Sequence, residues 1–174
     1  MEFVQNKPMY LIIQDTEFNQ KYHNYKLGDI CDCSKQHNAK YVSYKKAKHK
    51  WFRTPKEKRI VFMESLHEKV RRSINPDLPS RLESIILYDN AQDCLDLAKK
   101  WKTNSGIVPL GFFKVNCTGK LHACATTPDE KKPKELTKQA HLAGITRFWQ
   151  GDKNAKVKEY FFQGQAQIIE CLEF

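Results

Sequence analysis

The carboxylate of Glu159 stands at the start of a stretch whose pattern is typical of a β-strand. Aromatic and β-branched residues dominate residues 156–169, and three glutamines alternate there with small or apolar neighbours. This period of two predicts a strand, with Gly164 as a bulge or a point of close approach. A carboxylate at the mouth of a buried strand can accept a hydrogen bond from a sugar hydroxyl or stabilise a developing cation. A solvated glutamate at a strand end gives the same pattern.

A second candidate for chemistry is the basic segment at residues 40–59. It holds nine lysines or arginines and one acid, Glu57, so its local net charge is +8. Aromatic residues are interleaved with these cations, which together can bind phosphates and stack on bases. The candidate nucleic-acid-binding residues are Lys45, Lys46, Lys48, Lys50, Trp51 and Arg53. The alternative is a mobile, solvated loop whose aromatic side chains pack back on the core.

The whole chain is also basic. Its 174 residues include 30 lysines and arginines against 20 acids, which gives a formal net charge of +10. This excess favours polyanionic partners such as nucleic acid, an acidic protein face or a phosphate-bearing cofactor. A generally basic surface without a specific partner is the alternative.

Two groups of cysteine and histidine residues are candidate metal ligands, because the members of each group lie close together in the sequence. They are Cys31, Cys33 and His37 in one group, and Cys117, His122 and Cys124 in the other. Neither group has the two-residue gap between cysteines that is typical of zinc sites, so no metal is predicted. A Cys–His nucleophile pair stays open, because six cysteines and six histidines can meet in many ways. The glycine-rich dinucleotide and phosphate loops and the nucleophile elbow are absent from the sequence.

The elements that must position these residues form one domain of the α+β class. Apolar periodicity predicts strands at 9–13, 84–88, 110–117 and 159–169. It predicts helices at 59–74, 90–101 and 134–148, with Asn90 as the N-cap of the second. Residues 126–134 and the proline-rich connector at 75–81 are expected to be loops. We expect a mostly antiparallel β core flanked by helices.

Three stretches together resemble the ADP-ribosyltransferase superfamily. Glu159-Tyr160 and the following strand resemble its last catalytic motif, as in the poly-ADP-ribose polymerases and the rifampin-modifying transferases. Ser84-Ile85-Ile86-Leu87-Tyr88-Asp89, followed by the helix at 90–101, resembles the second motif. Pro8–Ile13 together with Leu27-Gly28-Asp29-Ile30 resembles the first strand and the glycine–aspartate stretch of the rifampin-modifying group.

The resemblance implies a split, mostly antiparallel ADP-ribosyltransferase-like core over residues 1–174, with a basic insertion at about 36–59. It implies NAD as the substrate and Glu159 as the catalytic carboxylate, which orients the ribose and stabilises the oxocarbenium-like transition state. Arg81 and Arg147 are the candidates to bind the pyrophosphate. The other candidate NAD-binding residues are Tyr10, Ser84 and Tyr88, of which the two tyrosines would stack on nicotinamide.

The chain departs from the family pattern at two positions. Leu11 stands where the polymerase-like pattern has a histidine, and Ile86 stands where it has a tyrosine. The toxin-like pattern has an arginine in the first strand, and none is present here.

Two functions agree with these features of the sequence. The first is an NAD-dependent mono-ADP-ribosyltransferase, a bacterial toxin or defence effector that modifies nucleic acid or protein and has an antitoxin partner. The second is a non-catalytic, basic nucleic-acid-binding protein on the same fold.

The sequence also gives expectations about the compartment. It holds no run of about 18 apolar residues that would span a membrane. Its first 15 residues lack a basic start with a small-residue cleavage site, so no secretory signal is predicted. Six dispersed cysteines do not form the framework of a small disulfide-bonded scaffold. We expect a cytoplasmic protein that does not insert into membranes.

Overall fold

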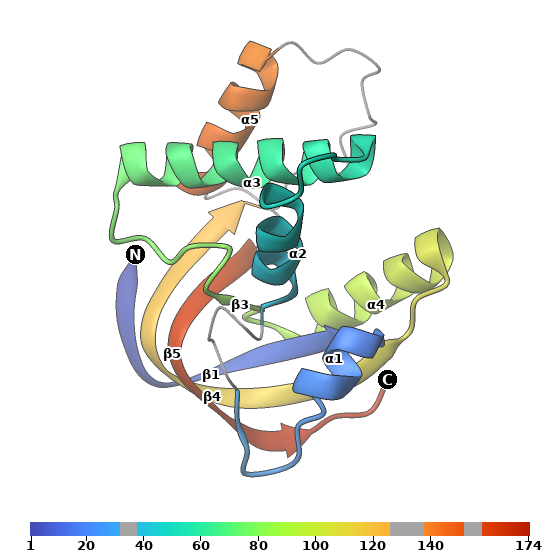
Figure 1. Cartoon of the computed structure of the whole chain (residues 1–174). Helices are drawn as coiled ribbons and strands as arrows, with labels where there is room; N and C mark the ends of the chain where they lie inside the picture. Colours follow the sequence, from blue (N-terminus) through green and yellow to red (C-terminus); the bar gives the residue numbers. More distant parts are fainter. Residues whose placement is uncertain (32–37, 126–137, 152–157) are drawn as a thin grey trace.

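The computed structural model describes residues 1–31, 38–125, 138–151 and 158–174. Helices and strands follow one another along the chain without a repeating unit (Figure 1). In order they are β1 Glu2–Gln14, α1 Glu17–Tyr22, β2 Ile30–Cys31, α2 Ala39–Lys48, α3 Pro55–Ile74, β3 Ile85–Leu87, α4 Ala91–Ser105, β4 Pro109–Ala125, α5 Lys138–Gln150 and β5 Lys158–Cys171. The expected α+β class, with an antiparallel β core and flanking helices, is confirmed.

The sheet is antiparallel throughout its described part, with the strands in the order β1-β4-β5-β2. β2 and β3 pair with different halves of β5. Just after β3, Tyr88 exchanges two backbone hydrogen bonds of 2.8 and 2.9 Å with Tyr10 of β1. This bridge connects the end of β3 to the free edge of β1. The curved sheet in Figure 1 therefore closes around an apolar interior.

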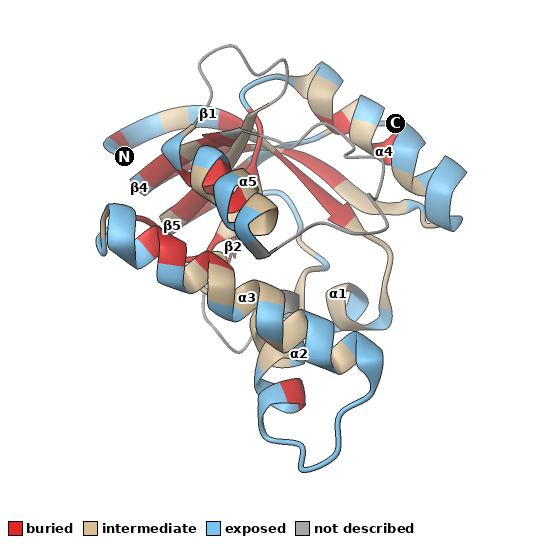
Figure 2. Ribbon diagram, turned by 90° about the horizontal axis from the view of Figure 1, so that it is seen from above, coloured by how far each residue is buried: buried red, intermediate tan, exposed pale blue. Residues whose placement is uncertain are grey.

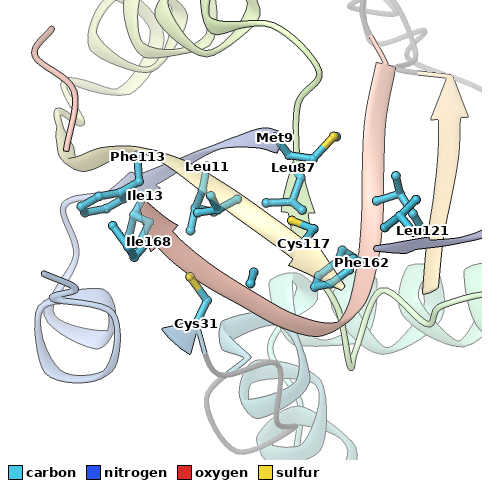
Figure 3. Close-up of a cluster of buried hydrophobic side chains, with 13 residues drawn as sticks. Met9, Leu11, Ile13, Cys31, Leu87, Phe113, Cys117, Leu121, Phe162 and Ile168 are labelled. Carbon is cyan, nitrogen blue, oxygen red and sulfur yellow. The ribbon is translucent and has the colours of Figure 1, made fainter. Parts of the chain in front are cut away.

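The interior cluster is built from alternate positions of the long strands. Met9, Leu11 and Ile13 of β1 meet residues of β4 and β5, among them Val115 and Phe162 (Figure 3). Because side chains on a strand alternate between its two faces, every second residue enters this cluster. The interior is thus formed by strands that are far apart in the sequence.

Helices cover the other face of the sheet in two separate places. Ile12 of β1 and Phe112 of β4 pack against Cys94 and Ala98 of α4. At the other end, Phe161 of β5 packs in a cluster with side chains of α3 and α5. Figure 2 shows the corresponding contrast, with buried residues on the sheet-facing sides of the helices and exposed residues outside. The space between these two clusters is where the candidate site lies.

Gly164 of β5 is a point of close approach. It is the register partner of Gly119 in β4, and the β4–β5 register continues through the pair without a shift. Both glycines have a positive φ, near +155°. A Cβ atom on Gly164 would collide with the carbonyl oxygen of Thr118. Of the two alternatives for Gly164, close approach is confirmed and a bulge is wrong.

Most of the expected elements are present, with different bounds. β1 and β4 extend well beyond the apolar runs that predicted them, because both edges of β4 are paired. The predicted N-cap is confirmed, since the Asn90 side chain accepts from the backbone N–H of Asp93 at 2.9 Å. The short helix α1 was not among the predicted elements. The predicted loop at 126–134 and the start of the helix predicted from 134 lie outside the described residues.

No helix in the described part of the chain combines the length and apolar character that crossing a membrane requires.

Candidate functional site

A cavity of about 350 Å³ lies between the middle of the sheet and the elements around it. Its walls come from β1, the stretch around α1, the segment 81–88, α4 and the start of β5. Four residues that the sequence had singled out for NAD chemistry line this one cavity. They are Arg81, Ser84, Tyr88 and Glu159. The remainder of the wall is largely apolar, and volumes of this order are typical of small-molecule sites.

Glu159 enters the cavity from the first residues of β5. Its backbone is the register partner of Cys124 in β4, and the next residue, Tyr160, is also paired with Leu87 of β3. The residue is half-buried. Within the described residues its carboxylate makes no hydrogen bond and no ion pair. A carboxylate that is fixed by a strand and has no partner among the described residues can bind a ligand hydroxyl or a developing positive charge.

The charge of Glu159 acts on its neighbours. Burial, followed by the nearby charge of Glu159, raises the pKa of the Tyr88 hydroxyl above its usual range. The same two causes raise the pKa of the Cys124 thiol. Both groups therefore stay protonated at neutral pH, and Glu159 supplies the negative charge at this end of the cavity.

Ser84 lines the cavity, and its hydroxyl is buried. The residue is only 4% exposed, and its Oγ atom has no hydrogen-bond partner in the structure. Its backbone carbonyl accepts a 2.9 Å hydrogen bond from the side-chain amide of Asn38, which fixes the loop. Buried polar atoms normally have partners, because leaving one unpaired costs roughly 1–3 kcal/mol. The unpaired Ser84 hydroxyl beside the cavity is therefore a candidate for a ligand contact.

Arg81 lines the cavity and is held from two directions. Its Nη2 atom lies 3.2 Å from a carboxylate oxygen of Glu64, and its Nη1 atom lies 2.9 Å from Nε2 of His67, both on α3. Its guanidinium also packs over the ring of Phe148 at 5.6 Å. The Nε atom is buried without a partner. Arg81 is thus a positioned cation with hydrogen-bonding capacity left for an anion.

A hydrogen-bond network holds the connector in front of Arg81 against α3. Glu68 accepts from Arg71 at 2.6 Å, from Arg72 at 2.9 Å and from the Ser80 hydroxyl at 2.9 Å. Arg71 also donates to the carbonyl of Leu78. Burial disfavours the Glu68 carboxylate, but the hydrogen bonds from these three partners outweigh it and lower its pKa to about 2. The network fixes the backbone from which Arg81 projects.

The depressed pKa predicts a pH-dependent stability. Lowering the Glu68 pKa from its ordinary 4.5 to about 2 corresponds to roughly 3 kcal/mol of folding stability. A carboxyl group with a depressed pKa stabilises the folded state at pH values above its pKa in the unfolded state. The contribution of Glu68 is therefore complete near neutral pH and is lost as the pH falls from about 5 to about 2. We expect Glu68→Gln to be less stable than wild type at pH 7, with a difference that shrinks by about 2 kcal/mol at pH 3. Urea unfolding at both pH values measures this difference in the free energy of unfolding, and Glu170→Gln, at an exposed carboxylate, is the control. A difference between wild type and Glu68→Gln that does not change with pH would contradict the prediction.

Two other predicted contacts do not reach the cavity. Tyr10 does not line it: its backbone forms the bridge to Tyr88, and its ring packs against Phe112 with centroids 6.3 Å apart. Arg147 is exposed in the last turn of α5 and is absent from the cavity wall. Position near a motif in the sequence was the only basis for either assignment. The structure brings together Arg81, Ser84, Tyr88 and Glu159 without them.

Comparison with known families places the whole chain in one of them. Residues 1–174 match the model of a family described as "Protein of unknown function (DUF2441)". The chain belongs to the DUF2441 family. A search of curated proteins found no match to it.

Several residues of this DUF2441 cavity were not predicted as site residues. Asn38 lines the wall and is also the N-cap of α2, which is a signal that its sequence context could have given. His23 and Tyr25, hydrogen-bonded to each other at 2.8 Å, line the wall near α1. Trp101 lines it from α4. A flat ring at this position can stack on an aromatic ligand.

The cysteines of the DUF2441 chain do not form a metal site in the described residues. No group of three or more His, Cys, Asp or Glu side chains with ligand geometry occurs there. Cys117 faces the interior cluster, whereas Cys124 lies in the cluster under α3 and α5. His122 bonds through Nε2 to the carbonyl of Trp149 at 2.9 Å. Cys33 and His37 of the other group lie outside the described residues.

Proposed function

We propose that this DUF2441 protein is an NAD-dependent mono-ADP-ribosyltransferase whose active site is the cavity around Glu159. The observation that carries the proposal is that three residues with available polar groups line one largely apolar cavity. The Ser84 hydroxyl and the Nε–H of Arg81 are buried without a partner, and the Glu159 carboxylate makes no hydrogen bond within the described residues. This set supplies an anion for a sugar cation, a hydroxyl for orientation and a cation for a phosphate.

The chemistry breaks the bond between nicotinamide nitrogen and the ribose carbon. Nicotinamide leaves with the bonding electron pair, and positive charge develops on the sugar. Glu159 lies in the cavity wall and stabilises that charge electrostatically. The acceptor nucleophile then bonds to the same carbon and gives up its proton to Glu159 or to water. Apolar walls exclude water and strengthen the interaction of Glu159 with the cation.

The size of the cavity suits only part of the NAD molecule. About 350 Å³ is at the lower end of the range for ligand sites. This volume suits the nicotinamide and its ribose, with the pyrophosphate near Arg81 and the adenosine outside. Trp101 and Tyr88 supply aromatic surface for the nicotinamide ring.

The resemblance to toxins and defence effectors further implies an antitoxin partner. The free thiols at Cys31, Cys94, Cys117, Cys124 and Cys171 favour a reducing compartment, the cytoplasm.

One observation favours the second candidate, a binding protein without transferase activity. Leu11 and Ile86, which stand where the polymerase-like pattern has histidine and tyrosine, both line the cavity. They make its wall more apolar than that pattern would. Release of nicotinamide from NAD separates the two candidates, because the binding protein would release none.

Ser84→Ala tests whether the cavity binds NAD. The Oγ atom has no protein partner, so its removal relieves an unpaired buried group and leaves the melting temperature unchanged or raised. The lost ligand hydrogen bond is expected to weaken NAD binding about 3- to 10-fold. Calorimetric titration with NAD and a thermal melt measure both effects.

Ser73→Ala is the matched control, because that hydroxyl bonds to the carbonyl of Val70 on α3 and does not line the cavity. It should leave the affinity for NAD unchanged. If wild type binds no NAD, or if Ser84→Ala binds it as tightly as wild type, the site is wrong.

A further inference from the structure

The most exposed aromatic side chains of the described chain lie at the tip of a helical hairpin. We call α2, residues 49–54 and the first turn of α3 the basic arm. Trp51 is 92% exposed and Phe52 is 85% exposed, and both lie between the two helices of the arm. Figure 2 shows this tip projecting from the molecule, with exposed residues around it. The alternative that these rings pack back on the core is therefore wrong for both.

The tip is an ordered structure. The guanidinium of Arg53 donates to the carbonyls of Ala47 at 2.7 Å and Lys48 at 2.6 Å, which caps the end of α2. Thr54 and Glu57 form a reciprocal capping box at the start of α3. Lys50 closes the turn by an ion pair of 2.5 Å with Glu57. These bonds fix the backbone on both sides of the two rings. Because the backbone is already ordered, little further conformational entropy is lost when a ligand stacks on the rings.

The structure divides the predicted cations into two groups. Arg53 and Lys50 hold the tip together, as just described. The exposed cations around the rings are Lys45, Lys46, Lys48, Lys56, Lys58 and Arg59. The carboxylate of Glu57, the one acid among residues 40–59, is already paired with Lys50. The surface around Trp51 and Phe52 therefore carries a strong, uncompensated positive charge.

We propose that the basic arm binds single-stranded nucleic acid and presents it to the cavity as the acceptor of ADP-ribose. Trp51 and Phe52 stack on bases, and the surrounding lysines bind the phosphates. Exposed rings require unstacked bases, which single strands offer and duplexes do not. An acidic protein would satisfy the lysines and leave the two adjacent rings without flat partners. The role as acceptor rests on the proposed transferase function, whereas binding by the arm does not.

The arm is connected directly to the cavity. Asn38, the N-cap of α2, lines the cavity wall and bonds to the carbonyl of Ser84. From there α2 extends over ten residues, Ala39–Lys48, toward the tip. At 1.5 Å per residue the rings lie about 15 Å along the helix from the cavity. A strand stacked on the tip and following the lysines of α2 would reach the cavity within a few nucleotides.

Binding of fluorescent oligonucleotides of about 12 nucleotides tests the arm, with a single strand and the matching duplex measured by anisotropy at several salt concentrations. Trp51→Ala/Phe52→Ala should weaken single-strand binding at least about tenfold and leave the salt dependence unchanged. Lys45→Glu/Lys46→Glu should flatten the slope of log affinity against log salt by about 0.7 per lost phosphate contact. Comparing the affinities for RNA and DNA strands of the same sequence shows which of the two nucleic acids the arm prefers.

One control for the change in charge and one for the loss of an exposed ring lie elsewhere on the surface. Lys99→Glu/Lys102→Glu on α4 makes the same change in net charge, and Phe3→Ala removes a ring that is 73% exposed. Both should bind the single strand as wild type does. The assay contains no NAD, so its failure and the failure of NAD cleavage are independent. Wild-type affinity in Trp51→Ala/Phe52→Ala, duplex binding as tight as single-strand binding, or no binding at all would each overturn the inference.

Discussion

Glu159→Gln is expected to reduce the release of nicotinamide from NAD by a factor of about 10²–10³. The amide keeps the shape and the hydrogen-bonding capacity of the side chain but loses the negative charge that stabilises the sugar cation. The fold should be unaffected, because the carboxylate makes no hydrogen bond or ion pair within the described residues. Nicotinamide release measured by chromatography, and a thermal melt, test the two parts of this prediction.

A carboxylate on the same strand provides the control. Glu170 of β5 is exposed and lies 3.9 Å from Lys114, on the opposite end of the strand from the cavity. Glu170→Gln removes one negative charge from β5 and should leave nicotinamide release unchanged. A folded Glu159→Gln protein with the wild-type rate would remove this residue from the mechanism.

Arg81→Met is expected to lose both stability and affinity for NAD. It leaves Glu64, whose side chain is only 12% exposed, without its ion-pair partner, at a cost of roughly 3–5 kcal/mol. The affinity for NAD should fall about 10- to 100-fold, as for the loss of a charged hydrogen bond. Urea unfolding and calorimetric titration measure the two losses.

The double substitution Arg81→Met/Glu64→Leu separates the two roles of Arg81. It removes both charges together, so most of the lost stability should return. Affinity for NAD should stay low, because the cavity wall then lacks the Arg81 cation. If the double variant binds NAD like wild type, Arg81 serves only the fold.

Local patterns in the sequence predicted those parts of the fold that depend on neighbours in the chain. The strand at Lys158–Cys171 and the N-cap at Asn90 were recognisable because alternation and capping are properties of a few consecutive residues. Helix α2 was not predicted, because a run rich in lysine has no apolar face to mark its period. Its N-cap, Asn38, was the one local signal for it.

The candidate site could be predicted only in part for a related reason. Arg81, Ser84 and Tyr88 lie on one short segment of the sequence, so their proximity in the cavity wall follows from their spacing along the chain. Glu64 and His67 were missed because their contact with Arg81 depends on how α3 packs against that segment. Arg147 was assigned from its place in the sequence, and the helix that carries it turns it away from the cavity. Tertiary packing decides such contacts, and periodicity carries no information on it.

We propose that the cavity around Glu159 transfers ADP-ribose from NAD. The most direct measurement is incubation of the protein with NAD labelled in its adenylate phosphate and a cell extract, followed by separation of macromolecules from small molecules. We predict that label enters the macromolecular fraction together with release of nicotinamide, that nuclease rather than protease removes it, and that Glu159→Gln abolishes it. Protease-sensitive label would keep the transferase and reject nucleic acid as the acceptor. The absence of both nicotinamide release and macromolecular label with the folded wild-type protein would contradict the central claim.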